Sequence, residues 1–184
     1  MRRTEPLPDF TYHPDPLGTG SVEPSDATCQ CCGRARGFIY TGPVFATEDL
    51  ESALCPWCIA DGTAAQKFEA EFVDSAAVGG YGEWVSVPTE VAAIVSRRTP
   101  GFSGWQQERW WTHCGDAAVF LGAAGASEIA GPWAGAIASL RADVGYDDLT
   151  WADYAAALDK DRGPTAYVFR CRHCGQLGGY SDCH

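Results

Sequence analysis

The chain has 184 residues, of which 46% are hydrophobic and 12% aromatic, and its formal net charge at pH 7 is −11. This length allows one domain or two small ones with a real core, and the aromatic content argues against disorder outside the ends. A strongly acidic chain lacks the positive charge that neutralises phosphates, so we expect no direct nucleic-acid partner. Its apolar stretches fall short of the roughly 20 residues of a membrane span, so we expect no membrane insertion.

The cysteine content indicates a reducing compartment. The chain contains nine cysteines, an odd number, and its opening MRRTEPLPDF lacks the apolar run of a signal peptide. Clustered thiols in reducing compartments bind metal more often than they form disulfides. We therefore expect a cytoplasmic, metal-binding protein.

The first third of the chain predicts three segments in order. Residues 1–27 are rich in proline and turn formers, which predicts an extended N-terminal arm laid over a core. Bulky and turn residues alternate over residues 37–45, which predicts a β-hairpin. Phe68 and Phe72 are spaced i, i+4 within residues 59–73, which predicts a helix that begins at the preceding cysteine pair.

Two cysteine pairs in this region have the spacing of a closed zinc site. They are Cys29-x2-Cys32 and Cys55-x2-Cys58, and each spacing lets two thiolates reach one ion. A knuckle, a hairpin and a helix that carries the second pair predict a treble-clef-like zinc unit over residues 28–100. Cys31 lies between two ligands and is interpreted as a spare buried thiol.

Redox chemistry is the alternative for the second of these pairs. Cys55-Pro56-Trp57-Cys58 resembles the C-P-x-C motif of thiol oxidoreductases, in which the helix N-terminus lowers the pKa of the first thiol. That fold needs a βαβ frame around the motif, and the sequence does not indicate one. It also leaves Cys29 and Cys32 without a role.

The rest of the chain predicts a second, zinc-ribbon-like unit over residues 101–184, so the fold class is α+β. Before it, Pro88 opens a helix that runs through Arg98. Strands or turns are expected over residues 105–122, and a strand over 166–170. Between them, residues 123–163 are expected to form a helical insert, in which Thr150 caps a helix from Trp151 to Leu158.

The second metal site draws its ligands from distant positions. Cys171-x2-Cys174 repeats the paired spacing, and Cys114 is the best third ligand. The fourth ligand stays open among four residues, which are His113, Asp116, Cys183 and His184. A nucleophile and base pair at His113 and Cys114 is the alternative, but adjacent residues in a strand point to opposite faces.

The acidic residues are concentrated after the first cysteine pair. Seven carboxylates lie between positions 48 and 74 against the single cation Lys67: Glu48, Asp49, Glu51, Asp61, Glu69, Glu71 and Asp74. The segment predicts a basic protein partner, which Glu48, Asp49 and Glu51 would contact. The alternative is that the charge serves solubility alone.

Four stretches carry a resemblance to a known family. They read YHPDPL at 12–17, GFIYTGP at 37–43, CPWCIADG at 55–62, and RTPGF at 98–102 followed by WQQ at 105–107. These stretches resemble the bacterial CbrC family, and the resemblance covers nearly the whole chain. Some members of that family carry a cysteine in place of Ala118, which is why the fourth ligand stays open. The family carries a label of colicin tolerance, so the resemblance implies a bacterial cytoplasmic protein that protects against a toxin, without established catalytic residues.

The sequence therefore predicts a binding function. We expect an acidic, zinc-binding immunity or tolerance protein that neutralises a basic toxin domain such as a nuclease. The alternatives are an enzyme, either a thiol oxidoreductase that uses Cys55 and Cys58 or a hydrolase, and a zinc-stabilised regulatory adaptor. His13 is expected to make a structural hydrogen bond, with a site role as the alternative. The oligomeric state stays open.

Overall fold

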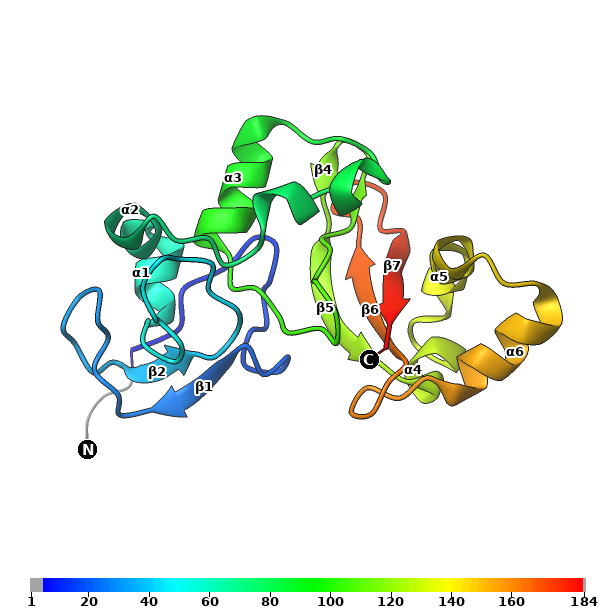
Figure 1. The fold of residues 1–184 in the computed structure, drawn as a ribbon, viewed down its shortest axis with the longest axis horizontal. Helices are drawn as coiled ribbons and strands as arrows, with labels where there is room; N and C mark the ends of the chain where they lie inside the picture. Colours follow the sequence, from blue (N-terminus) through cyan, green and yellow to red (C-terminus); the bar gives the residue numbers. More distant parts are fainter. Residues whose placement is uncertain (1–4, 184) are drawn as a thin grey trace. The chain divides into compact units, whose positions relative to one another are not determined.

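The computed structural model describes residues 5–183, which form helices and small sheets in two compact units (Figure 1). The N-terminal unit comprises Met1–Val78 and Pro88–Ser103, and the C-terminal unit comprises Gly79–Val87 and Gly104–His184. Residues 79–87, which the sequence placed in the first zinc unit, therefore belong to the second. Two hydrogen bonds hold them there, from Gly79 N to Trp110 O (3.0 Å) and from Thr112 Oγ1 to Val85 O (2.5 Å).

A two-stranded antiparallel sheet opens the N-terminal unit. Strand β1 (Val22–Ser25) pairs with β2 (Gly37–Tyr40), and Val22 lies opposite Tyr40. The hairpin predicted within residues 37–45 is therefore wrong, because the partner strand comes from the segment before the first cysteine pair. After β2 the chain turns away through Pro43, whose carbonyl accepts a hydrogen bond from the Tyr40 hydroxyl (2.8 Å).

The helix predicted over residues 59–73 is two short helices. Helix α1 (Pro56–Ala60) begins directly after Cys55, and α2 (Thr63–Phe68) follows. Gly62 separates them with φ of 80°, a conformation that glycine adopts at low cost. Phe72 lies beyond the helix, fully buried and edge-on to Tyr40 at 5.6 Å between ring centroids.

The N-terminal arm packs onto this unit through buried side chains. Phe10, Tyr12 and His13 are buried, whereas residues 1–4 of the expected arm lie outside the described residues. His13 Nδ1 donates to Pro100 O (2.7 Å), and His13 Nε2 lies 2.6 Å from Thr19 Oγ1. His13 thus ties the arm to the end of α3 (Thr89–Arg98), a helix whose bounds confirm the prediction.

A three-stranded antiparallel sheet forms the centre of the C-terminal unit. Its order is β5 (Val119–Ala124), β6 (Thr165–Arg170) and β7 (Leu177–Asp182). Before β5, a short hairpin joins β3 (Thr112–His113) to β4 (Asp116–Ala117). These elements confirm the strands expected before residue 122 and over residues 166–170.

The expected helical insert joins β5 to β6. It contains α4 (Ala126–Ala130), a 3-10 turn η3 (Ala134–Ala136), α5 (Ile137–Val144) and α6 (Asp148–Ala157), and Figure 1 shows α4, α5 and α6 on one side of the sheet. Leu140 and Trp151 pack with Val168 of the sheet in one apolar cluster. Asp147, not Thr150, caps α6, because its carboxylate accepts the Thr150 N–H (2.8 Å). Within residues 5–183, no helix has the length and apolar character that crossing a membrane requires.

Candidate metal centres

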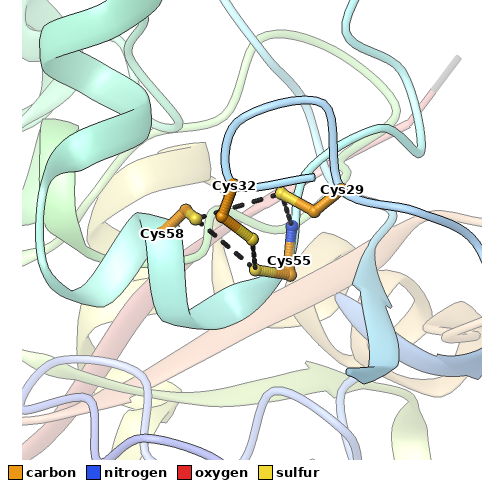
Figure 2. Close-up of side chains that lie close together, drawn as sticks. All are labelled: Cys29, Cys32, Cys55 and Cys58. Carbon is orange, nitrogen blue, oxygen red and sulfur yellow. Dashed lines mark hydrogen bonds between the residues drawn. The ribbon is translucent and has the colours of Figure 1, made fainter. Parts of the chain in front are cut away.

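The cysteine group of the N-terminal unit gathers Cys29, Cys32, Cys55 and Cys58. The first two lie in the loop between β1 and β2, Cys55 precedes α1, and Cys58 lies on α1 (Figure 2). Pro56 begins α1, where its fixed φ suits the first helical position and its missing N–H costs nothing. The first turn of α1 therefore holds Cys55 and Cys58 close together in space.

The sulfur spacing in the cysteine group fits a tetrahedral ion. Sulfur atoms about 2.3 Å from a central zinc ion would lie about 3.8 Å apart. The Sγ atoms lie 3.9 Å apart for Cys29 and Cys58, 3.9 Å for Cys32 and Cys55, and 3.6 Å for Cys55 and Cys58. A disulfide needs about 2.05 Å, and all four cysteines are free. The group could hold a metal ion.

Hydrogen bonds and burial set the pKa values of the thiols in the cysteine group, and these values favour binding of a cation. Hydrogen bonds from the Cys55 thiol and from backbone N–H groups lower the pKa of Cys29 to about 4. The same contact with Cys29 and burial raise the pKa of Cys55, and burial raises that of Cys58 to about 12. Four thiolates this close repel one another, so full ionisation needs a divalent cation at the centre.

Two cationic side chains brace the loop of the cysteine group. Lys67 on α2 donates from Nζ to Gln30 O (3.0 Å) and Cys31 O (3.2 Å). Arg36 lies over the Trp57 ring, 4.2 Å from its centroid, and pairs with Glu5 of the arm. Sequence reasoning missed the role of Lys67, because only the folded chain places α2 beside this loop.

The histidine–cysteine group of the C-terminal unit gathers His113, Cys114, Cys171 and Cys174. The Cys114 and Cys174 sulfur atoms lie 3.9 Å apart, and His113 Nδ1 lies 3.2 Å from Cys114 Sγ and 3.5 Å from Cys174 Sγ. With zinc bonds of about 2.3 Å to sulfur and 2.0–2.1 Å to nitrogen, tetrahedral edges are about 3.6–3.8 Å. This group could also hold a metal ion.

One backbone turn recurs in both groups. Cys29 N donates to Arg34 O (2.9 Å), and Gly33 N donates to Cys29 O (2.8 Å). In the second group, Cys171 N donates to Gln176 O (2.8 Å) and Gly175 N to Cys171 O (3.1 Å). Gly33 and Gly175 have φ of 68° and 75°, which explains the glycine after each pair.

Asp116 supports the histidine–cysteine group from beside it. Its Oδ2 accepts hydrogen bonds from Arg172 Nη1 (2.7 Å) and His173 Nε2 (3.1 Å), two residues within the Cys171–Cys174 turn. The Trp111 ring stacks on the His113 ring at 5.2 Å. Asp116 thus links the β3–β4 hairpin to the second cysteine pair. Sequence reasoning weighed Asp116 only as a direct ligand, although the cations between the two cysteines were visible.

The two groups differ in exposure. Cys29, Cys55 and Cys58 are buried in the N-terminal core, and only Cys32 reaches the surface. In the other group Cys171 is buried, whereas Cys114 and Cys174 are exposed. Backbone N–H groups lower the pKa of Cys171 to about 6 against the effect of burial, and burial with the neighbouring thiols raises that of Cys114 to about 11.

Two cysteines described by the structure, Cys31 and Cys183, lie outside both groups. Cys31 lies 3.7 Å from Thr63 Oγ1 and is only half-buried, so its interpretation as a buried thiol is wrong. Cys183 is exposed. His184, a candidate fourth ligand, lies outside the described residues. Among the four candidates for that position, the structure brings His113 to the three cysteines.

Six of the seven residues of the acidic segment fall into two sets. Asp61 and Asp74 accept the N–H groups of Thr63 and Ala76 (2.9 Å each), and Glu71 pairs with Arg97 at 3.4 Å. The residues predicted to contact a partner instead line one surface cavity of about 420 Å³. All three side chains at its rim are exposed: Glu48, Asp49 and Glu51.

Comparisons with known proteins identify relatives along the whole chain. Residues 7–183 match the model of a family described as "Uncharacterised protein family (UPF0167)". A UPF0167 protein of Mycobacterium bovis is 46% identical over 185 residues, which cover 96% of this chain and 93% of the relative. A UPF0167 protein of Pseudomonas aeruginosa is 46% identical over 172 residues, which cover 93% and 94%. No solved structure matches. The chain therefore belongs to the UPF0167 family.

Proposed function

We propose that the protein is an acidic binding protein stabilised by two zinc ions, and that its partner is a basic protein domain. Zinc is favoured at both groups because it takes four thiolate or imidazole ligands in a tetrahedron, at the distances described above. Neither group leaves a coordination position open for water or substrate, which favours a structural role for both ions. We interpret the N-terminal unit as treble-clef-like and the C-terminal unit as ribbon-like.

The observation that carries this proposal is the cavity lined by Glu48, Asp49 and Glu51. Within residues 5–183, no ion pair involves these three carboxylates, so their charge is available to a cationic partner. Thr41 and Ser103 line the same cavity and add hydroxyl groups for hydrogen bonds. A concave surface with three carboxylates suits a lysine or arginine side chain of a partner. The net charge of −11 would steer that partner toward the chain.

A basic toxin domain such as a nuclease is the partner that we favour. A nuclease presents a cationic surface to phosphate groups, and a cluster of carboxylates can occupy such a surface in place of nucleic acid. The resemblance to the CbrC family, with its label of colicin tolerance, supports this choice of partner. A cytoplasmic location fits the same role.

The enzyme alternative has less support. An attacking thiol of an oxidoreductase is accessible and has a lowered pKa. Cys55 is 1% exposed and its pKa is raised, and its sulfur lies among three others. A thiol in this environment is suited to metal binding.

Co-expression tests the proposal against a charge-matched control. Candidate partners are basic proteins encoded by neighbouring genes, and the readout is rescue of growth when such a protein is toxic. Reversing Glu48, Asp49 and Glu51 to lysine should reduce rescue. Reversing three exposed carboxylates outside the cavity, Glu23, Asp26 and Glu69, changes the net charge equally and should leave rescue near that of the wild type.

If the acidic cavity binds the partner, its lysine variant should show a lower association rate. The lysine variant of the cavity should associate more slowly with the partner in stopped flow, and added salt should slow the wild type in the same way.

Equal rescue by both triple variants would remove this cavity from the proposal. Absence of rescue by the wild type would remove the toxin domain as the partner.

A further inference from the structure

A second cavity lies in the C-terminal unit, away from the residues of the histidine–cysteine group. Its volume is about 420 Å³, within the range of small-molecule sites. It lies among a 3-10 turn η2 (Gly80–Gly82), residues 106–109, the end of α5, α6 and β7. Four of its lining residues are tyrosines: Tyr81, Tyr146, Tyr154 and Tyr180.

The tyrosines provide both a rigid wall and an open rim. Tyr180 is buried, with its ring 5.0 Å from Tyr167 and its hydroxyl accepting the Arg109 N–H (3.0 Å). Tyr154 donates to Ser181 Oγ (3.0 Å) and packs edge-on against Tyr146 at 5.2 Å. Tyr81 and Tyr146 are 48% and 41% exposed. Aromatic surface is therefore available at the rim of the cavity.

Among the described residues that line this cavity, Arg109 alone has a cationic side chain, and its charge is already neutralised. Arg109 lies over the Tyr180 ring at 4.4 Å, which shows that the ring face accepts a cation. The guanidinium also binds Glu83 (2.8 Å) and Asp143 (2.8 Å), whose side chain is 9% exposed. Two carboxylates thus offset one positive charge, and an anionic ligand would find no unpaired cation among the lining residues.

Asp182 adds further negative charge to the lining. Its Oδ2 accepts the Gln106 N–H (3.2 Å), whereas its Oδ1 is buried and has no hydrogen-bond partner among the described residues. Burial raises the pKa of Asp182, against hydrogen bonds from Gln106 and Tyr167 and the charge of Arg109, which lower it. Burial and the charges of Asp182 and Glu108 raise the pKa of Tyr167 and of Tyr180, although Glu108 does not itself line the cavity. A cationic ligand would offset this charge.

We propose that this cavity binds a small organic cation of the alkylammonium class, with Tyr146 and Tyr154 against its alkyl groups and Asp182 offsetting its charge. Tyrosine rings attract cations through their negative faces, and a dispersed, weakly hydrated ammonium loses little hydration on entry. This site is independent of the proposed protein partner, because its lining residues belong to the C-terminal unit and the acidic cavity belongs to the other.

The test compares choline with 3,3-dimethyl-1-butanol, which has nearly the same shape but no charge. Calorimetry on the zinc-loaded full chain should detect saturable choline binding, with at least tenfold weaker binding of the neutral alcohol. Asp182→Asn and Tyr146→Ala should each weaken choline binding about tenfold, in line with the cation–π and charge contributions. Asp153→Asn removes an exposed carboxylate of α6 outside the cavity and should change nothing.

Three results would overturn the proposal. They are the absence of saturable binding at millimolar choline, equal binding of the neutral alcohol, and unchanged binding in both cavity variants. Thermal melts establish that each variant is folded. If Asp182→Asn fails to fold, Tyr146→Ala still decides the question, because Tyr146 is 41% exposed and its removal leaves the core intact.

Discussion

The two metal groups use the same turn in different surroundings. In the N-terminal unit, Cys29, Cys55 and Cys58 belong to the apolar core beside Leu54 and Ile59. In the C-terminal unit, two of the three cysteines are exposed, and the hairpin that carries Cys114 has strands of only two residues. The same chelating turn can therefore form part of a core or hold a surface hairpin in place, depending on which side chains pack around it.

The two proposed zinc ions should accordingly differ in how much they contribute to folding. Without a cation, the cysteine group would leave crowded thiols inside the N-terminal core, whose apolar side chains converge on them. The C-terminal unit has a separate aromatic core, in which Trp110, Phe120 and Phe169 contact one another at 5.1–6.1 Å. We therefore expect the first ion to govern folding of its unit, and the second to govern a local segment.

The largest expected effect is the difference in stability between cysteine replacements in the two groups. Cys55→Ser should lower the free energy of unfolding of the N-terminal unit by several kcal/mol, because zinc binding contributes directly to folding. Cys174→Ser should cost clearly less, because Cys174 is exposed and lies outside the strands of the sheet. Thermal or denaturant unfolding with elemental analysis of zinc measures both effects.

Cys31→Ser is the matched control for that comparison. Cys31 lies in the same loop but outside the group, so its replacement should retain two zinc ions per chain. A chelator should remove zinc from wild type in two phases, the faster one from the exposed group. Equal destabilisation by Cys55→Ser and Cys174→Ser would contradict the proposed division of roles.

The second effect concerns acid stability of the N-terminal unit. Burial lowers the pKa of His13 from an ordinary value of 6.5 to about 4, although the hydrogen bond to Pro100 O and the charge of Asp15 oppose this shift. The unfolded chain therefore binds a proton that the folded chain does not, and stability falls as the pH drops from about 6.5 toward 4. By pH 5 the loss should reach about 2 kcal/mol.

The pH slope distinguishes His13 from the metal groups. Denaturant unfolding of wild type and His13→Gln between pH 7 and pH 5 should show a shallower slope for the variant, because any loss of zinc is common to both. The C-terminal unit should retain its wild-type slope in the variant. Parallel slopes for the N-terminal unit would show that His13 is not the titrating group.

The third effect concerns the contribution of Asp116 to metal affinity at the histidine–cysteine group. Asp116→Asn keeps the shape of the side chain but weakens its contacts with Arg172 and His173. Supporting side chains of this kind typically change metal affinity by about 10–100-fold. Competition with a chromogenic chelator should show weaker zinc binding at this group alone, with Asp153→Asn as a charge-matched control. An equal loss at the cysteine group would contradict a local role.

The smallest effect is expected at Lys67. Lys67→Met keeps the aliphatic stem but removes the ammonium that donates to Gln30 O and Cys31 O. Because these bonds are exposed to solvent, the N-terminal unit should lose at most about 1 kcal/mol. Zinc release from the cysteine group should quicken slightly, whereas Lys160→Met in the other unit should not change it. A loss as large as that of Cys55→Ser would mean that Lys67 organises the whole loop.

Short-range spacing explains what the sequence predicted well. A C-x2-C pair chelates through a turn that closes within six residues, so Cys29, Cys32, Cys171 and Cys174 are recognisable without the fold. The bounds of α3 and β6 also follow from local signals, namely a proline start and a run of strand formers. In each case the interactions that decide the structure lie close together in the sequence.

Features that join distant segments depend on tertiary packing and could not be predicted from the sequence. The strand paired with β2 comes from the arm, residues 79–87 join the C-terminal unit, and Asp116 reaches Arg172 across 56 positions. The different burial of the two groups is likewise not encoded in the C-x2-C turn, which is the same at Cys29–Cys32 and Cys171–Cys174. Local sequence fixes which atoms can chelate an ion, because the turn is closed by neighbouring backbone groups. Which side chains surround that ion depends on contacts between distant segments, and these form only when the core of each unit assembles.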